Sequence, residues 1–485
     1  MLAMFTGACA LGCGGGTSGE TGIPPAPDYS MYTDTMDFYA YSPPTDGTWK
    51  LDGELMSTGE DYRSVARYRE YAEAGLTMLL AQSSGQYGGE TWEGSIAQMV
   101  LDNAYEAGIT KVILADTRIF ALSRSETGLV GPGLTFSSYD ALDAYVESCM
   151  APYADHPGFY GLQLVDEPTY KQFKAIGEVY KSIRRVRPGT FVQCNLCPLD
   201  NNSFADARYP AGDDIYTRFE QYLRDWLRES GADYIMYDSY PFKANGIMDT
   251  FIRGLQIAGK VCRDEHVKFY HVAQTCAINR AGQPYLREVN EDDMYWQINM
   301  ALGHGVKQLA YFTYWTKQDN QTNGEFFIDG ASFMTRDGKK TDLYPVMQQI
   351  HDEIRKFAPV IMQFDFNASK YVAKRPTSLP ASYIASAEDS ATFMGVDEVT
   401  VDKEVAMVTE LKDSVNGRYL YMVQNAINPY YKNGAATKQT VTVTFAERFE
   451  YVAVYCKGEV RTERLENGTY SVRLDPGQAE YLMPY

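Results

Sequence analysis

The sequence has few basic residues for its length. Its 485 residues include 44 Lys and Arg against 63 Asp and Glu, which gives a net charge of −19. Binding to nucleic acid or to an anionic membrane surface requires basic patches, so this balance argues against both partners. A strongly anionic substrate is also disfavoured, because a local basic pocket would have to override the overall charge.

Signature motifs of several enzyme classes are missing too. No glycine-rich phosphate loop follows the first β-rich run, and no Gly-x-Ser-x-Gly elbow precedes a helical pattern, which argues against nucleotide-binding enzymes and serine hydrolases. Cys194 and Cys197 have the spacing of half a zinc site, but there is no second pair and no nearby His. We therefore expect no metal, no organic cofactor, and buried free thiols.

The N-terminus is short, apolar and rich in small residues. Residues 1–13 read MLAMFTGACALGC and are followed by GGGTSG, a flexible tether by composition. This resembles the end of a bacterial lipoprotein signal without its charged n-region, and Cys13 is the lipidation candidate. We expect residues 1–30 to be a signal remnant and linker that anchors the protein at the bacterial cell surface or in the periplasm. A simple N-terminal tail is the alternative.

Eight short β-rich runs alternate with amphipathic helical patterns as far as about residue 360. The β-rich runs lie at 37–42, 77–83, 111–116, 158–166, 190–196, 234–238, 268–274 and 308–314, and the helical patterns at 59–73, 94–106, 139–154, 170–185, 215–229, 247–264, 291–302 and 344–357. Short turns that contain glycine lead from several helices into the next strand. Eight such units predict a (β/α)₈ TIM barrel over residues 31–365, with an open doubly wound sheet as the alternative.

Beyond residue 365 the helical patterns end and short alternating strands follow. They lie at 405–411, 419–424, 439–445, 451–456, 469–474 and 480–483, with turns at Asn416-Gly417, Asn467-Gly468 and Pro476-Gly477. This pattern predicts an antiparallel β-sandwich domain over residues 368–485.

The fourth β-rich run ends in Asp166-Glu167-Pro168. Proline can continue neither a strand ladder nor a helix interior, so the strand must stop there. The two carboxylates then lie beyond its C-terminal end, which in a TIM barrel is the rim that carries the active site.

The other predicted strands also end in polar and aromatic residues. Carboxylates and amides can hydrogen-bond sugar hydroxyls, and aromatic rings can stack on sugar faces. The set contains one cation, Arg118, and it therefore favours an uncharged polyol substrate. The candidate contacts are Tyr41, Asp116, Asn195, Asp238, Tyr240, Gln274, Tyr314 and Trp315.

Residues 37–360 resemble the clan of retaining (β/α)₈ glycoside hydrolases that includes the β-galactosidase and cellulase families. The resemblance lies in the acidic residue, Glu and Pro at the end of strand four, in DYIMYDSYP at 233–241 and in LAYFTYW at 309–315. It implies that Glu167 is the general acid/base and that Trp315 is a sugar platform. Two positions depart from the family pattern: Asp166 replaces the usual Asn, and Gln274 stands where strand seven should present the nucleophilic Glu.

Three interpretations follow for a rim with Gln274 in that position. Asp166 and Glu167 could act as a pair in which Asp166 orients a substrate acetamido nucleophile, an arrangement that resembles the hexosaminidases. Asp238 could instead partner Glu167 across an inverting water, at about 6.5–9.5 Å. In the third, the rim is a non-catalytic sugar-binding cup. We expect a glycoside hydrolase that acts on a neutral or weakly charged glycan, with a glycan-binding surface lipoprotein as the alternative.

Overall fold

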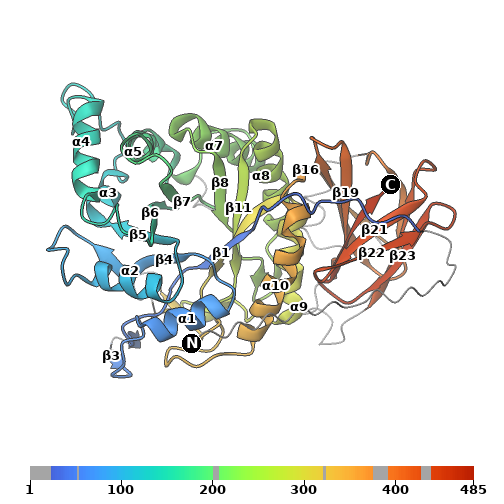
Figure 1. Ribbon diagram of the computed structural model, residues 1–485, viewed down its shortest axis with the longest axis horizontal. Coiled ribbons are helices and arrows are strands. Elements are labelled where there is room, and N and C mark those ends of the chain that lie inside the picture. Colours follow the sequence, from blue (N-terminus) through green and yellow to red (C-terminus); the bar gives the residue numbers. More distant parts are fainter. Residues whose placement is uncertain (1–22, 52–53, 200–206, 320–323, 375–391, 428–437) are drawn as a thin grey trace, which may run out of the picture.

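The computed structural model describes residues 23–51, 54–199, 207–319, 324–374, 392–427 and 438–485, so the predicted lipidation site at Cys13 lies outside the described residues. Each of the eight β-rich runs contains a parallel strand (Figure 1). One four-stranded sheet has the order β1-β14-β11-β8 and the other β4-β5-β6-β7. The bounds are β1 Asp37–Ala40, β4 Leu79–Tyr87, β5 Val112–Asp116, β6 Phe159–Asp166, β7 Phe191–Asn195, β8 Tyr234–Asp238, β11 Lys268–Gln274 and β14 Val306–Phe312.

Backbone hydrogen bonds also connect the two sheets to each other. Beyond β7, the amide of Leu196 donates to the carbonyl of Met236 in β8 over 2.8 Å. Before β4, the amide of Met78 donates to the carbonyl of Phe38 in β1 over 3.0 Å. Each pair of outer strands, β7 with β8 and β1 with β4, is therefore in contact.

Helices follow most of the strands, as the amphipathic patterns predicted. Their bounds are α1 Val65–Glu73, α2 Ile96–Glu106, α3 Thr117–Leu122, α4 Tyr139–Met150, α5 Phe173–Val186, α7 Ile215–Ser230, α8 Phe251–Glu265, α9 Glu291–Gly303 and α10 Leu343–Ile361, with the 3₁₀ turn η1 Tyr170–Gln172 before α5. The first helix begins at Val65 rather than at 59, because the backbone of its N-cap residue Ser64 is still extended. The short helix α3 was not predicted.

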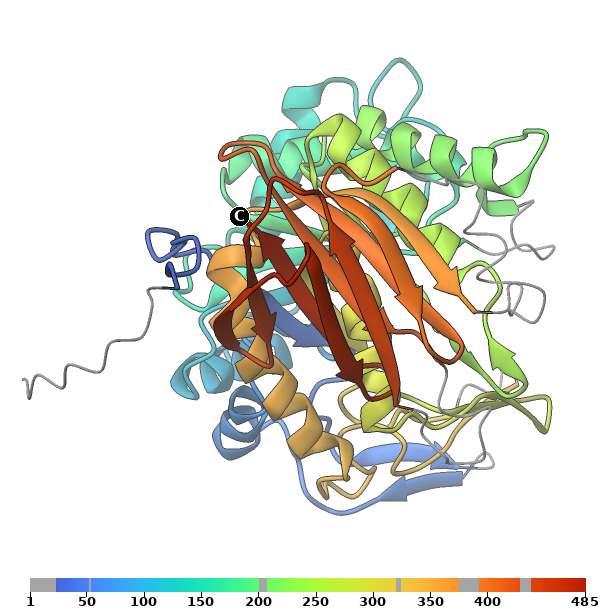
Figure 2. The same cartoon turned by 90° about the vertical axis from the view of Figure 1, so that its right-hand side faces the viewer.

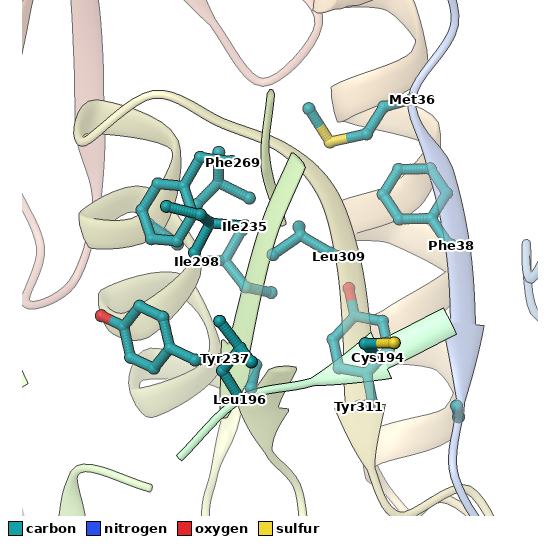
Figure 3. Packing of buried hydrophobic residues seen from close by; sticks show 14 of the residues in the cluster. Met36, Phe38, Cys194, Leu196, Ile235, Tyr237, Phe269, Ile298, Leu309 and Tyr311 are labelled. Atoms are coloured by element: carbon teal, nitrogen blue, oxygen red, sulfur yellow. The ribbon is translucent and has the colours of Figure 1, made fainter. Parts of the chain in front are cut away.

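The strands contribute to two cores because their side chains alternate between faces. Residues such as Phe38, Tyr237 and Leu309 belong to the large core that the strands share with the helices (Figure 3). Their neighbours Tyr39, Met236 and Ala310 belong to a second cluster, to which all eight strands contribute. The inner faces of the two sheets therefore share one core.

Short strands occur in the loops that follow the parallel strands. The hairpin of β2 Thr48–Leu51 and β3 Glu54–Ser57 follows β1. A five-stranded sheet, in the order β10-β9-β13-β12-β15, is built from the loops after β8, β11 and β14. Its strands are β9 Phe242–Lys243, β10 Gly246–Ile247, β12 Ile278–Arg280, β13 Gln283–Leu286 and β15 Glu325–Phe327.

The C-terminal region consists of two antiparallel sheets, which lie beside α9 and α10 (Figures 1 and 2). The six-stranded sheet has the order β16-β18-β19-β24-β21-β22, the three-stranded sheet has the order β17-β20-β23, and one apolar cluster contains residues of both. The bounds are β16 Asp365–Ala373, β17 Val396–Val401, β18 Val405–Asp413, β19 Arg418–Asn425, β20 Gln439–Phe445, β21 Tyr451–Cys456, β22 Glu459–Arg464, β23 Thr469–Leu474 and β24 Ala479–Pro484. The strands that sequence analysis missed, β16, β17 and β22, are all edge strands.

Helix α9 contacts the antiparallel region, as do α8 and α10. The Trp296 indole donates to the carbonyl of Ala426 over 3.1 Å, and the Asn299 amide donates to that of Gly477 over 3.0 Å. Within the described ranges, the search for a helix with the length and hydropathy of a membrane span finds none. The described residues include six free cysteines; five of these are buried as expected, and Cys456 is partly exposed.

Candidate active site

The chain changes direction sharply between Asp166 and Pro168. Glu167 has a φ of 47°, in the left-handed region that residues other than glycine seldom adopt. Its backbone N–H donates to the carbonyl of Asn195 over 2.8 Å, which ties this turn to the end of β7. Such a conformation costs free energy and persists where the surroundings enforce it, which is a recurrent property of functional sites.

The side chain of Asn195 joins two of the predicted catalytic carboxylates. Its Nδ2 atom donates to Asp166 Oδ1 over 3.0 Å and to Asp238 Oδ1 over 2.8 Å. The two acceptor oxygens therefore lie within about 6 Å of each other, the sum of these lengths. Asn195 was expected to contact a sugar, but in this structure its amide donates to the two acids.

Burial and the charges of neighbouring acids stabilise the protonated forms of Glu167 and Asp238. Burial and the charges of Asp238 and Asp166 raise the pKa of Glu167 well above its usual range. Burial and the charge of Asp166 raise the pKa of Asp238 to about 6, against hydrogen bonds from Asn195 and Tyr240. Asp166 is exposed to solvent, yet crowding by protein also raises its pKa. Asp166 is therefore open to solvent although protein atoms surround most of its carboxylate.

Two cations that sequence analysis missed act on these acids. The positive charges of Lys317 and Arg208 both lower the pKa of Asp166, and that of Arg208 also lowers the pKa of Glu167. Lys317 lies in the loop after β14, and Arg208 lies between β7 and α7. Neither residue directly ends a strand, so a search restricted to strand ends could not find them.

Two predicted tyrosines accompany the acids. Tyr41 is buried, its hydroxyl accepts a hydrogen bond from Gln193 over 2.9 Å, and the charges of Asp166 and Asp238 contribute to the raised pKa of its hydroxyl. Tyr240 hydrogen-bonds Asp238 and stacks on the Phe312 ring, with 5.3 Å between centroids. Because both tyrosines interact with these acids, both belong to the candidate site.

The prediction that Asp116 contacts a substrate is wrong. Its carboxylate is fully buried, and Arg118 binds both of its oxygens, at 3.0 and 2.6 Å. The Tyr153 hydroxyl donates to the same group over 2.9 Å, and Asp116 also caps the N-terminus of α3. Asp116 and Arg118 thus form an ion pair, and the buried carboxylate of Asp116 is not available to a sugar.

Gln274 was also expected to contact a sugar, and this expectation fails as well. The side chain is fully buried, and its Oε1 accepts from the amide of Phe242 over 2.9 Å. Its Nε2 donates to the carbonyls of Phe242, Cys276 and Arg287 at 3.1 to 3.3 Å. The amide is therefore fully engaged in holding the loops after β8 and β11.

The two aromatic residues after β14 differ from their predicted role. Tyr314 is buried and packs edge-on against Tyr71 of α1 at 4.8 Å, so it faces the helices and cannot reach a substrate at the rim. Trp315 is 2% exposed, and its indole donates to the carbonyl of Arg336 over 3.1 Å. It still lines a cavity of about 280 Å³.

The arrangement provides a proton donor of raised pKa, Glu167, beside an accessible carboxylate, Asp166. Proton transfer to and from a bound molecule is the chemistry that such a pair supports. Among the described residues, no group of three His, Cys, Asp or Glu side chains could hold a metal ion.

Comparison with known proteins gives structural neighbours but no sequence relative. No family model matches the sequence, and no curated protein matches it. An Anoxybacillus α-amylase is 11% identical, covers 94% of this chain and 98% of its own, and gives a TM-score of 0.49. A glycoside hydrolase of family 5 from Bacteroides vulgatus is 10% identical, with 92% and 94% covered and a TM-score of 0.45. An endoglucanase from Pseudomonas stutzeri is 14% identical, with 61% and 85% covered and a TM-score of 0.35. These neighbours are glycoside hydrolases.

Proposed function

We propose that the protein is a glycoside hydrolase that cleaves a neutral or weakly charged glycan, with Glu167 as the general acid. The observation that carries this proposal is the raised pKa of Glu167 beside Asp166 and Asp238, at the C-terminal ends of β6 and β8. A carboxyl group whose protonated form is stabilised by burial and by neighbouring acids can protonate the oxygen of a leaving sugar. No metal or organic cofactor takes part in this proposal.

The second carboxylate in the proposed reaction is Asp166. Its side chain is exposed to solvent, whereas Asp238 is 3% exposed and is held by Asn195 and Tyr240. Asp166 can therefore meet a ligand, where it orients the nucleophile, either a water or a substrate acetamido group. Asp238 remains behind it as a charge that raises the pKa of Glu167.

A non-catalytic glycan-binding protein on the same scaffold is the second candidate. It is favoured by Gln274, which stands where the resembling enzymes carry their nucleophile and which is occupied with backbone groups. In this case the rim would bind a glycan without turning it over.

For the architecture, we propose that the two parallel sheets close into one TIM barrel within residues 31–365 and that residues 368–485 form a β-sandwich. The hydrogen bonds between β7 and β8 and between β1 and β4, together with the inner core that all eight strands share, support closure. A lipid anchor at Cys13 would place the protein at a bacterial cell surface or in the periplasm.

A screen of aryl glycosides and of plant and host oligosaccharides tests the function. We expect turnover by the wild-type protein and a loss of about 10²- to 10⁴-fold in Glu167→Gln. Glu147→Gln, at an exposed position on α4, is the matched control and should retain activity. Unaltered turnover in Glu167→Gln would remove this residue from the mechanism. Glycan binding by a wild-type protein that turns nothing over would favour the second candidate.

A further inference from the structure

A cavity of about 280 Å³ lies at the same end of the parallel strands as the three acids. Its lining comes from the loops after β1 and β14 and from Ser84 of β4, while the acids lie at the ends of β6 and β8. The cavity and the acids therefore occupy different sectors of one rim. The lining residues that matter here are Trp49, Arg63, Trp315, Lys317 and Arg336.

The buried side chain of Arg336, which is 7% exposed, holds the loop that carries Lys317. The Arg336 guanidinium donates to the carbonyl of Lys317 at 3.1 and 3.2 Å and pairs with Asp319 at 2.9 Å. The same guanidinium donates to the carbonyl of Phe327 over 2.8 Å. A buried ion pair with further hydrogen bonds of this kind fixes a loop in one conformation, so the position of Lys317 is set by the fold.

Lys317 is the cation of this cavity that has no carboxylate partner within the part of the chain that the structure describes. Arg63 is paired with Asp61 and Arg336 with Asp319. The Lys317 ammonium instead lies over the rings of Phe312 and Phe327, at 5.2 and 5.8 Å from their centroids. Its charge also reaches Asp166. Lys317 therefore lines the cavity and also acts electrostatically on one of the acids.

We propose that Lys317 binds a single anionic group on the substrate, so that the glycan is an acidic one with a sugar carboxylate or a sulfate ester in this cavity. The inference rests on the proposed function in that it takes the rim to bind a glycan. A half-buried ammonium with no ion-pair partner among the described residues can donate to an anion, and such charge-assisted hydrogen bonds are stronger than neutral ones. The rings of Phe312 and Phe327 hold the Lys317 ammonium in place, so little side-chain freedom is lost on binding.

Binding measurements test the inference independently of hydrolysis. Calorimetry with the Glu167→Gln protein would compare oligouronides, sulfated oligosaccharides and the corresponding neutral oligosaccharides. We expect one acidic class to bind to the Glu167→Gln protein. When Lys317→Met is added to that protein, the affinity for this class should fall about tenfold or more. Lys317→Arg should keep most of the affinity, and neutral sugars should change less than about twofold in either variant. Lys339→Met, which removes an exposed lysine paired with Asp337, is the matched control.

The outcomes separate the two proposals. Uronides bound in a Lys317-dependent manner identify the carboxylate, and sulfated sugars bound in this way identify the sulfate. Acidic sugars that fail to bind, or an equal loss for acidic and neutral sugars in Lys317→Met, would overturn the inference. Wild-type turnover of neutral glycosides alone would likewise overturn it and leave hydrolysis standing. Lys317-dependent binding of acidic sugars without wild-type turnover would keep the inference and defeat hydrolysis.

Discussion

Asp166 and Asp238 accept hydrogen bonds from one and the same nitrogen, Nδ2 of Asn195. Two carboxylates this close repel each other when both are ionised, and burial strengthens that repulsion. The shared donor offsets part of it and also fixes the separation of the two groups. Asn195 is thus the residue through which β6 and β8, on either side of β7, act as one site.

Removing this donor should move the pH dependence of the proposed reaction. The hydrogen bonds from Asn195 lower the pKa values of both acids, so Asn195→Ala should raise them. If ionised Asp166 is required, the acidic limb of the pH–rate profile moves to higher pH. Turnover at a fixed pH on that limb then falls about tenfold whenever the pKa of Asp166 rises by one. Initial rates from pH 4 to 8 check this, and an unchanged profile would contradict the role of Asn195.

The raised pKa of Asp238 should also appear in the protein's stability. Its folded pKa of about 6 exceeds the ordinary value of 3.8, so between these values the folded protein binds more protons than the unfolded chain. The free energy of unfolding therefore falls as pH rises through this window. Asp238→Asn removes this loss. Its free energy of unfolding relative to wild type should therefore increase by on the order of 2 kcal/mol between pH 4 and pH 7.

Urea unfolding at both pH values measures that gain. The gain is read as a difference between the two pH values, so any packing change that the substitution causes equally at both cancels. Asp140→Asn, which removes an exposed acid from α4, is the matched control. If the free energy of unfolding of Asp238→Asn changes with pH in parallel with that of wild type, the pKa of Asp238 is not higher in the folded protein than in the unfolded chain.

Restoring a carboxylate at the strand-seven position should harm the protein. In Gln274→Glu, an anion would replace an amide that donates to three backbone carbonyls in a fully buried position. We expect a loss of about 3–5 kcal/mol in the free energy of unfolding and no gain of a retaining reaction. Gln283→Glu, at an exposed position in β13, is the control and should be near neutral. Newly gained turnover in Gln274→Glu would instead mean that this position faces the substrate.

The fold was largely predictable because its signal is local. Period-two and helical patterns, together with glycines at the turns, located all eight parallel strands and six of the C-terminal strands. The C-terminal strands that escaped, β16, β17 and β22, are edges whose burial patterns are mostly intermediate or exposed. Edge strands form because a neighbouring strand offers hydrogen-bond partners, so the pattern of the edge strand's own sequence predicts it poorly.

The candidate site was only partly predictable. The end of β6 was located because proline stops a strand whatever its surroundings are. Asp116 and Tyr314 were misassigned because a strand-end position says nothing of the side chain's direction, and both side chains face away from the inner core. Lys317 was missed because its position depends on Arg336 and Asp319, which lie further along the chain.

The sequence by itself determined where strands and helices form and which acid ends the fourth strand, because hydrophobic periodicity and proline act over a few residues. The tertiary structure alone decided which strand ends meet. Asn195 bridges Asp166 and Asp238 because three strands lie side by side, and Gln274 is occupied because two loops pack around it. Electrostatic interactions and hydrogen bonds depend on distance in space, and folding sets the distances between residues that lie far apart in the sequence.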